Sequence, residues 1–174
     1  MHPTFRGGGV REPGPLSFGH DQLPDSIEYK MTPIYIAGIA MTVFGRHLDR
    51  AVHDLAQEAL DGAVKDANCK LSDIGVAFYS GMTQGYLQGQ ITIPGQVVFS
   101  KIGIDSIPIY NVENACASGS TAFHLAIQSL RAGNTDVALA LGAEKMNIPD
   151  KARAFSMFEA GWDVSRAEIG RAHV

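Results

Sequence analysis

The chain has 174 residues, of which 45% are hydrophobic and 18% charged, and its formal net charge is −4. This length suits one domain or one half of a two-domain enzyme, with enough apolar material for a core. The charge gives no reason to expect nucleic acid or an anionic membrane as partner, and no apolar stretch is long enough to span a bilayer. The two cysteines, Cys69 and Cys116, do not suggest a disulfide framework, so we expect a reducing, cytoplasmic compartment.

The first thirty residues differ in composition from the rest of the chain. Glycine and proline clusters, Gly7-Gly8-Gly9 and Pro13-Gly14-Pro15, interrupt them, and no hydrophobic period runs through them. Such a segment buries too little apolar surface to offset the entropy of ordering, and it lacks the apolar core of a signal peptide. We therefore expect a disordered leader over 1–30, with Met31 as a plausible natural start, followed by one domain over 31–167.

Strands and helices are expected to alternate along this domain. Apolar runs predict strands over 33–39, 76–79, 107–112 and 137–142. Helical spacing of apolar residues predicts helices over 49–67 and from about Ala117 to a stop at Gly133, and a short helix is expected near 96–102. Apolar strands that alternate with helices are typical of a parallel sheet covered on both faces. The pattern weakens after Met146, which indicates an insertion or a new subdomain.

Cys116 is the residue with the clearest chemical potential. It follows the apolar run that ends at Val112 and precedes a helical pattern, which predicts a sharp strand-to-helix junction. Unpaired N–H groups and the positive end of the helix dipole favour a thiolate at such a position. The small residues of 117–120 leave room for a ligand, so the thiol is a candidate nucleophile for acyl transfer. The alternative is a small buried hydrophobic residue at a tight turn.

Other candidate sites are weaker. The glycine-rich stretch 81–95 contains no phosphate-loop or dinucleotide fingerprint, and no Cys/His cluster has the spacing of a metal site. His124 lies eight residues beyond Cys116 on the same expected helix, roughly 12 Å along its axis, too far to contact the thiol. We expect Glu113 to be structural or at a subunit contact, and Glu144 and Lys145 to form a satisfied surface or interface pair.

Three segments of the chain have sequences and spacing that point to one enzyme family. The segment 111–122, Asn-Val-Glu-Asn-Ala-Cys-Ala-Ser-Gly-Ser-Thr-Ala, surrounds Cys116. The segments 35–45 and 137–146 lie at matching distances before and after it. Together they resemble the nucleophile segment, the opening strand and the fourth strand of thiolases, specifically of the lipid-transfer-protein (sterol-carrier) type. The resemblance covers about residues 33–163.

The resemblance implies an α/β fold: the N-terminal half of an α-β-α-β-α sandwich, with a mostly parallel mixed sheet and helices on both faces. It implies that Cys116 is the nucleophile and, through its backbone N–H, an oxyanion donor. The implied reaction is thiolytic cleavage of 3-ketoacyl-CoA, or the reverse Claisen condensation, in lipid or sterol metabolism. Acyl-CoA and coenzyme A would be substrates, with no permanently bound cofactor and no metal. The full-length protein would be a homodimer or higher oligomer.

Two departures from the family limit these expectations. The chain is about half as long as a full thiolase, and no segment matches the histidine and second-cysteine motifs of the family's C-terminal half. The last residues, 168–174, resemble the translation of a common sequencing adapter. We therefore expect this chain alone to be inactive in turnover. A condensing enzyme or retro-aldolase subunit on the same fold remains open, as does a non-catalytic acyl-CoA-binding or partner subunit.

Overall fold

The computed structural model describes residues 32–161 and Ser165. The expected leader over 1–30, the plausible start at Met31 and the adapter-like tail over 168–174 lie outside the described residues. No helix in the described part of the chain is long and apolar enough to cross a membrane.

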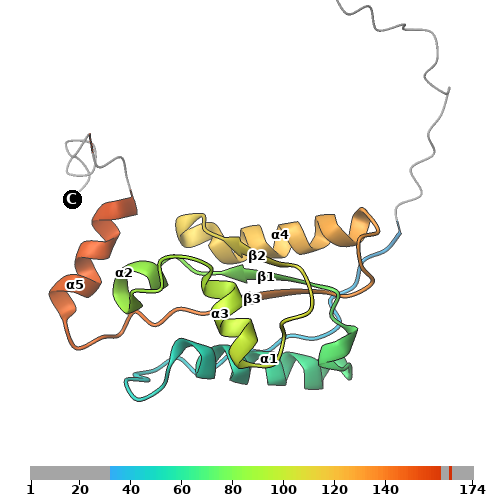
Figure 1. The fold of residues 1–174 in the computed structure, drawn as a ribbon, viewed down its shortest axis with the longest axis horizontal. Coiled ribbons are helices and arrows are strands. Elements are labelled where there is room, and N and C mark those ends of the chain that lie inside the picture. The colour runs from blue at the N-terminus through green and yellow to red at the C-terminus, as the bar shows by residue number, and fades with distance from the viewer. Residues whose placement is uncertain (1–31, 162–164, 166–174) are drawn as a thin grey trace, which may run out of the picture. The chain divides into compact units, whose positions relative to one another are not determined.

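Helices and strands alternate from residue 52 onward (Figure 1). In chain order the elements are α1 (Val52–Ala67), η1 (Leu71–Asp73), β1 (Val76–Ser80), α2 (Gln84–Gln88), α3 (Pro94–Lys101), β2 (Ile109–Val112), η2 (Ala115–Ala117), α4 (Ser118–Arg131), β3 (Ala138–Gly142), α5 (Lys151–Ser156) and η3 (Met157–Gly161). The two long predicted helices and three of the four predicted strands are present, with bounds that differ by a few residues. The short helix α2, within the glycine-rich stretch, was not predicted.

The three strands form one parallel sheet in the order β2-β1-β3. Phe78 of β1 pairs with Tyr110 of β2 on one side and with Ala140 of β3 on the other. Parallel strands of one sheet need crossover connections. Helices α2 and α3 connect β1 to its neighbour β2, and α4 connects β2 to β3 on the other side of β1. The predicted α/β class is confirmed, and every strand pairing in the described residues is parallel.

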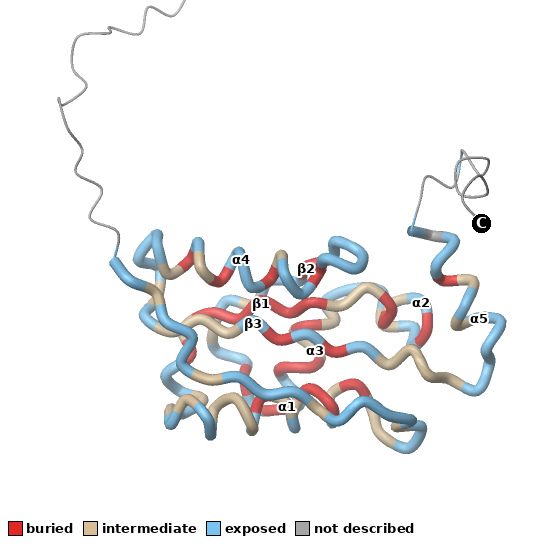
Figure 2. The backbone as a smooth tube through the Cα atoms, turned by 180° about the vertical axis from the view of Figure 1, so that it is seen from behind, coloured by how far each residue is buried: buried red, intermediate tan, exposed pale blue. Residues whose placement is uncertain are grey.

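Helices cover both faces of this sheet, so the expected layering is also confirmed (Figure 1). Successive side chains of β1 point to opposite faces, and all five of its residues are buried (Figure 2). One core lies between the sheet and helices α1 and α3, and it includes Leu60, Tyr79, Val98 and Phe99. The other lies between the sheet and α4, and it includes Phe78, Val112, Ala122 and Ala126.

The predicted strand over 33–39 is wrong, because this segment pairs with no strand in the described residues. It runs along α1 instead: the backbone N–H of Ile39 donates to the carboxylate of Asp66 at 2.9 Å. Gly38 approaches α1 so closely that an added Cβ would overlap the carbonyl oxygen of Ala63. An apolar run indicates that a segment is buried, but it does not show whether the segment pairs with a strand or packs on a helix. Here Gly38 permits a close approach, and the segment packs on α1.

Candidate functional site

Cys116 lies in η2, where the chain passes from β2 to α4. The preceding residue, Ala115, has a left-handed backbone with φ of +46°. This conformation costs a non-glycine residue roughly 1–2 kcal/mol, so other contacts must hold the turn in place. The reversal at Ala115 brings the exposed Cys116 to the start of α4. The predicted strand-to-helix junction is therefore confirmed.

Ser118 and Glu113 brace this turn. The Ser118 hydroxyl accepts from the backbone N–H of Asn114 at 2.8 Å and donates to the carbonyl oxygen of Ala115 at 2.7 Å. The Glu113 carboxylate accepts from the backbone N–H of Ala115 at 2.7 Å. Because Ser118 is buried, its two hydrogen bonds are shielded from competition with water. Glu113 has the structural role that the sequence suggested.

The backbone N–H of Cys116 takes no part in the hydrogen bonds that hold this turn. Its neighbours Asn114 and Ala115 donate to side chains, and Ala117 donates to the carbonyl oxygen of Asn114 at 2.9 Å. Among the described residues, no hydrogen bond involves the Cys116 N–H or its Sγ atom. The turn therefore presents an exposed thiol together with a backbone donor. Such a donor can stabilise the oxyanion that forms when a thiol attacks a carbonyl group.

Cys116 opens into a groove of about 570 Å³, a volume in the range of roughly 300–1,000 Å³ that small-molecule sites occupy. The groove lies at the carboxyl ends of β1 and β3, where parallel α/β sheets usually bind their ligands. Four parts of the chain line it besides the Cys116 turn and the start of α4: segment 40–47, Leu55 and Ala59 of α1, the ends of β1 and β3 with the residues after them, and the pair Met157 and Phe158.

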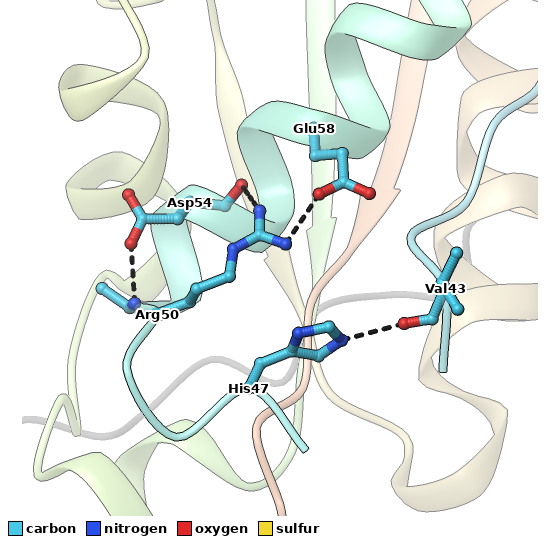
Figure 3. Close-up of polar contacts among 6 residues, drawn as sticks. Val43, His47, Arg50, Asp54 and Glu58 are labelled. Carbon is cyan, nitrogen blue, oxygen red and sulfur yellow. Dashed lines mark hydrogen bonds and ion pairs between the residues drawn. The ribbon is translucent and has the colours of Figure 1, made fainter. Parts of the chain in front are cut away.

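Polar contacts fasten the segment 40–47, which forms one wall of the groove (Figure 3). Within it, His47 Nε2 lies 2.9 Å from the carbonyl oxygen of Val43. Just beyond it, the guanidinium of Arg50 pairs with Glu58 at 2.7 Å and donates to the carbonyl oxygen of Asp54 at 2.9 Å. Arg50 thus ties the end of this wall to the first turns of α1. Sequence reasoning did not single out His47, and no local motif marks it.

Lys145, three residues after the end of β3, holds the chain just beyond this wall. Its ammonium group donates to the carbonyl oxygen of Leu48 at 3.1 Å and to that of Arg50. The expected pairing of Lys145 with Glu144 is wrong, since no ion pair joins them in the described part of the chain.

Glu144 lines the groove and holds the loop that follows β1. Its carboxylate accepts from the backbone N–H of Met82 at 2.5 Å and of Thr83 at 3.2 Å, and from the Thr83 hydroxyl. Burial, and then the charge of Glu144, raise the pKa of Tyr79, whose hydroxyl donates to Gln84 Oε1 at 2.7 Å. Sequence reasoning missed this network because its partners lie some sixty residues apart in the chain.

The remaining candidates lie away from Cys116. His124 is exposed on α4, with Gln128 Nε2 3.4 Å from its own Nε2, and it does not line the groove. Cys69 is partly buried just after the end of α1. In the described residues, no cluster of three or more His, Cys, Asp or Glu side chains could hold a metal ion.

Comparison with known sequences gives a consistent result. Residues 34–168 match the family model described as "Thiolase, N-terminal domain". Non-specific lipid-transfer protein-like 2 of Caenorhabditis elegans is 42% identical over 67% of this chain and 28% of its own length. Sterol carrier protein 2 of Bos taurus is 37% identical over 68% of this chain and 23% of its own. Acetyl-CoA acetyltransferase of Methanocaldococcus jannaschii is 35% identical over 72% of this chain and 32% of its own length. The chain therefore spans about a quarter to a third of these relatives.

Solved structures share the fold. An acetyl-CoA acetyltransferase from Syntrophomonas wolfei superposes with a TM-score of 0.51 and 25% identity, over 60% of this chain and 27% of the other. OleA from Xanthomonas campestris superposes with a TM-score of 0.52 and 23% identity, over 67% of this chain and 34% of its own. A 3-oxoacyl-(acyl carrier protein) synthase III from Xanthomonas oryzae superposes with a TM-score of 0.52 and 24% identity, over 65% of this chain and 34% of its own. The matching part is about a quarter to a third of each of these proteins.

Proposed function

This chain belongs to the thiolase family, and from that premise we propose that it carries the nucleophile of an acyltransferase that acts on acyl-coenzyme A thioesters. The observation that carries the proposal is the exposed Cys116 at the start of α4, with its own backbone N–H unused, at the mouth of a groove. The thiolate is the nucleophilic form of cysteine, and the start of a helix favours a negative charge. The names of the acetyl-CoA acetyltransferase relatives support the same reaction class.

The proposed reaction has two halves. The Cys116 thiolate attacks the C3 carbonyl of a 3-ketoacyl-CoA, and the Cys116 N–H stabilises the oxyanion. The C2–C3 bond then breaks, its electron pair leaves on C2 as the acetyl-CoA enolate, and the enolate takes a proton. The acyl group remains on Cys116 as a thioester until the thiol of coenzyme A attacks it and releases a shortened acyl-CoA. The reverse sequence is a Claisen condensation.

Acid–base partners for these steps are not in contact with Cys116 in the described residues, since no hydrogen bond to its Sγ atom is found there. We therefore assign to this chain the acylation of Cys116 by thioester exchange with an acyl-CoA. In this step the new C–S bond forms to Cys116, the C–S bond to coenzyme A breaks, and the coenzyme A thiolate leaves, so only the Cys116 thiolate and the oxyanion donor are needed. Removal of one member of a coupled catalytic group costs most of the rate, so sustained turnover would require further groups.

A second candidate function is lipid binding without chemistry. It is favoured by the apolar lining of the groove and by the names of two relatives, a lipid-transfer protein and a sterol carrier protein. In that case Cys116 would be a passive part of the lining, and its acylation would not follow from binding.

The test is to incubate the chain with octanoyl-CoA and measure its intact mass, with peptide mapping to locate the adduct. We expect one octanoyl group on Cys116, none on Cys69, and no adduct after Cys116→Ala. Modification of both cysteines at equal rates would contradict a specialised nucleophile. Saturable binding of octanoyl-CoA with no adduct would favour the lipid-binding function instead.

A further inference from the structure

A second cavity lies on the other side of β1 from the Cys116 groove. It is found at the carboxyl ends of β1 and β2, whereas the groove is found at those of β1 and β3, and the two share only Gly81 and Met82. Its volume is about 250 Å³, just below the range of roughly 300–1,000 Å³ of most small-molecule sites, so it suits a ligand of few atoms. The acyl transfer proposed above makes no use of this cavity.

Gln84 and Glu113 bring hydrogen-bonding atoms without partners to the cavity. Gln84 is only 7% exposed, and its Oε1 accepts from the Tyr79 hydroxyl at 2.7 Å, but its Nε2 donates to no partner among the described residues. No fully buried polar side-chain atom of those residues lacks a partner, so Nε2 reaches open space, and the open space that Gln84 lines is this cavity. Glu113 Oε1 accepts from the backbone N–H of Ala115, and no hydrogen bond or ion pair in the same part of the chain involves its Oε2.

The other polar side chains of the lining are already engaged. Asn111 Oδ1 accepts from the backbone N–H of Gly95 at 2.6 Å, and Gln90 Nε2 donates to the carbonyl oxygen of Thr92 at 2.6 Å. Glu113 is the one charged side chain in the described lining, so no cation competes for its free oxygen. The cavity therefore offers one negative charge and one neutral donor to a ligand.

Apolar side chains complete the wall. Ile91 and Ile93 line the cavity at 81% and 56% exposure, and neither belongs to a buried core. Ile93 has a left-handed backbone with φ of +45°, which is rare for a β-branched residue, and such outliers gather at ligand-binding positions. An ion pair at the exposed Glu113 is worth little by itself. Packing on these two isoleucines would therefore have to supply part of the affinity.

We propose that this cavity is a second ligand site, and that its ligand is a small organic cation: a primary ammonium group on a short hydrocarbon chain that ends in an uncharged oxygen. The ammonium group donates to Glu113 Oε2, and the hydrocarbon chain packs on Ile91 and Ile93. The oxygen accepts from Gln84 Nε2, the donor that the protein leaves without a partner. The proposal is independent of the acyl-transfer function, because it involves neither Cys116 nor the groove.

The first experiment compares three probes of equal length by ligand-observed NMR titration of the unaltered chain. We expect 5-amino-1-pentanol to bind with a Kd on the order of 1 mM, as its small size dictates. The neutral 1,5-pentanediol should bind about fivefold or more weakly, because it cannot form a charge-assisted hydrogen bond to Glu113. Hexylammonium should bind about threefold more weakly, because its terminal methyl group leaves Gln84 Nε2 unpaired.

Isoleucine methyl spectra locate the bound probe. The methyl signals of Ile91 and Ile93 should shift on addition of 5-amino-1-pentanol, and that of Ile39, which lines neither cavity, should not. Glu113→Gln keeps an oxygen that can accept from the Ala115 N–H and removes only the charge, so it should weaken binding about fivefold. Asp105→Asn is the matched control: it removes the same charge from an exposed residue outside the lining, and binding should not change.

Each result decides part of the proposal. Equal affinities for 5-amino-1-pentanol and 1,5-pentanediol would overturn the cation site, and so would equal effects of Glu113→Gln and Asp105→Asn. Tighter binding of hexylammonium would overturn the role given to Gln84, and shifts at Ile39 as large as those at Ile91 would overturn the location. Circular dichroism shows whether Glu113→Gln is folded, and the probe series on the unaltered chain decides the question if it is not. Acylation of Cys116 by octanoyl-CoA is measured separately, so failure of one proposal leaves the other standing.

Discussion

The hydroxyl of Ser118 donates to the carbonyl oxygen of Ala115 at 2.7 Å, across the turn that carries Cys116. The same hydroxyl accepts from the backbone N–H of Asn114 at 2.8 Å, so one side chain holds both residues that shape the turn. The position of the Cys116 thiol is thus set by a residue two places further along the chain. This local control explains how the turn tolerates a left-handed alanine.

Ser118→Ala should therefore affect both stability and reactivity. It removes two hydrogen bonds and leaves the Asn114 N–H unpaired, which should lower the free energy of unfolding by about 1–3 kcal/mol. Urea denaturation measures this loss, and the rate of Cys116 acylation should fall with it. Ser120→Ala is the control, since exposed Ser120 makes a single hydrogen bond to the carbonyl oxygen of Ala117 at 2.9 Å. Similar losses for both variants would argue against a bracing role for Ser118.

The two cysteines should differ in reactivity. Cys116 is exposed at the start of a helix, whereas Cys69 is only partly accessible. In the folded protein, iodoacetamide should alkylate Cys116 several-fold faster, because its thiol is exposed whereas that of Cys69 is partly covered. Peptide mass spectrometry at early times measures the ratio, and the difference should disappear in urea. Equal labelling of the folded protein would contradict the nucleophile assignment.

Two glycines should respond in opposite ways to alanine. A Cβ on Gly95 would lie 2.7 Å from the Cβ of Tyr79 and 2.8 Å from Asn111 Oδ1, so Gly95→Ala should destabilise the fold by about 1–3 kcal/mol. A Cβ on Gly119, in the first turn of α4, would meet nothing within 4 Å. Gly119→Ala should therefore raise stability by up to about 1 kcal/mol, through the higher helix propensity of alanine.

Gly119 also lines the groove, which gives its substitution a second readout. Acylation of Cys116 should become slower although the protein becomes more stable, because the added methyl group occupies part of the groove that Cys116 lines. A parallel rise in stability and acylation rate would show that the substrate does not approach over Gly119.

Tyr79 should make the stability depend on alkaline pH. Burial, and then the charge of Glu144, raise its pKa above the usual value of 10.0. Above pH 10 the unfolded chain therefore binds fewer protons than the folded protein, and the free energy of unfolding falls by up to roughly 1.4 kcal/mol per pH unit. Below pH 10 this contribution is constant. Denaturant midpoints from pH 8 to 11 should show a slope that Tyr79→Phe reduces and Tyr35→Phe, at an exposed position, does not.

Local pattern predicted the parts of this structure whose cause is local. The apolar faces of α1 and α4 follow from spacing within each helix, and the small residues after Cys116 marked its junction with β2. The prediction of a strand over 33–39 was wrong because a strand needs a pairing partner, and a segment's own sequence does not identify that partner. The left-handed Ala115 could not be predicted, since alanine is not a residue that favours this conformation.

The contacts that surround Cys116 could not be predicted from local sequence patterns either. The carboxylate of Glu144 finds its partners in the loop after β1, and the wall at Met41 is fastened by Lys145 near the other end of the domain. Each of these contacts joins residues far apart in sequence, and no spacing rule encodes them. The position of Cys116 at a strand-to-helix turn could be predicted from the sequence, whereas the shape of the groove beside it could not.

The groove is built from opposite ends of the described chain, and this has a consequence for the order of assembly during synthesis. The turn at Cys116 and the strands around it can form as soon as β3 has left the ribosome, because their contacts are already present. The wall at Met41 is made first but must wait for Phe158, almost the last described residue, before the groove is closed. Contacts of such long sequence separation form late in folding. A nascent chain would thus hold the Cys116 thiol in its turn before the wall at Phe158 is in place.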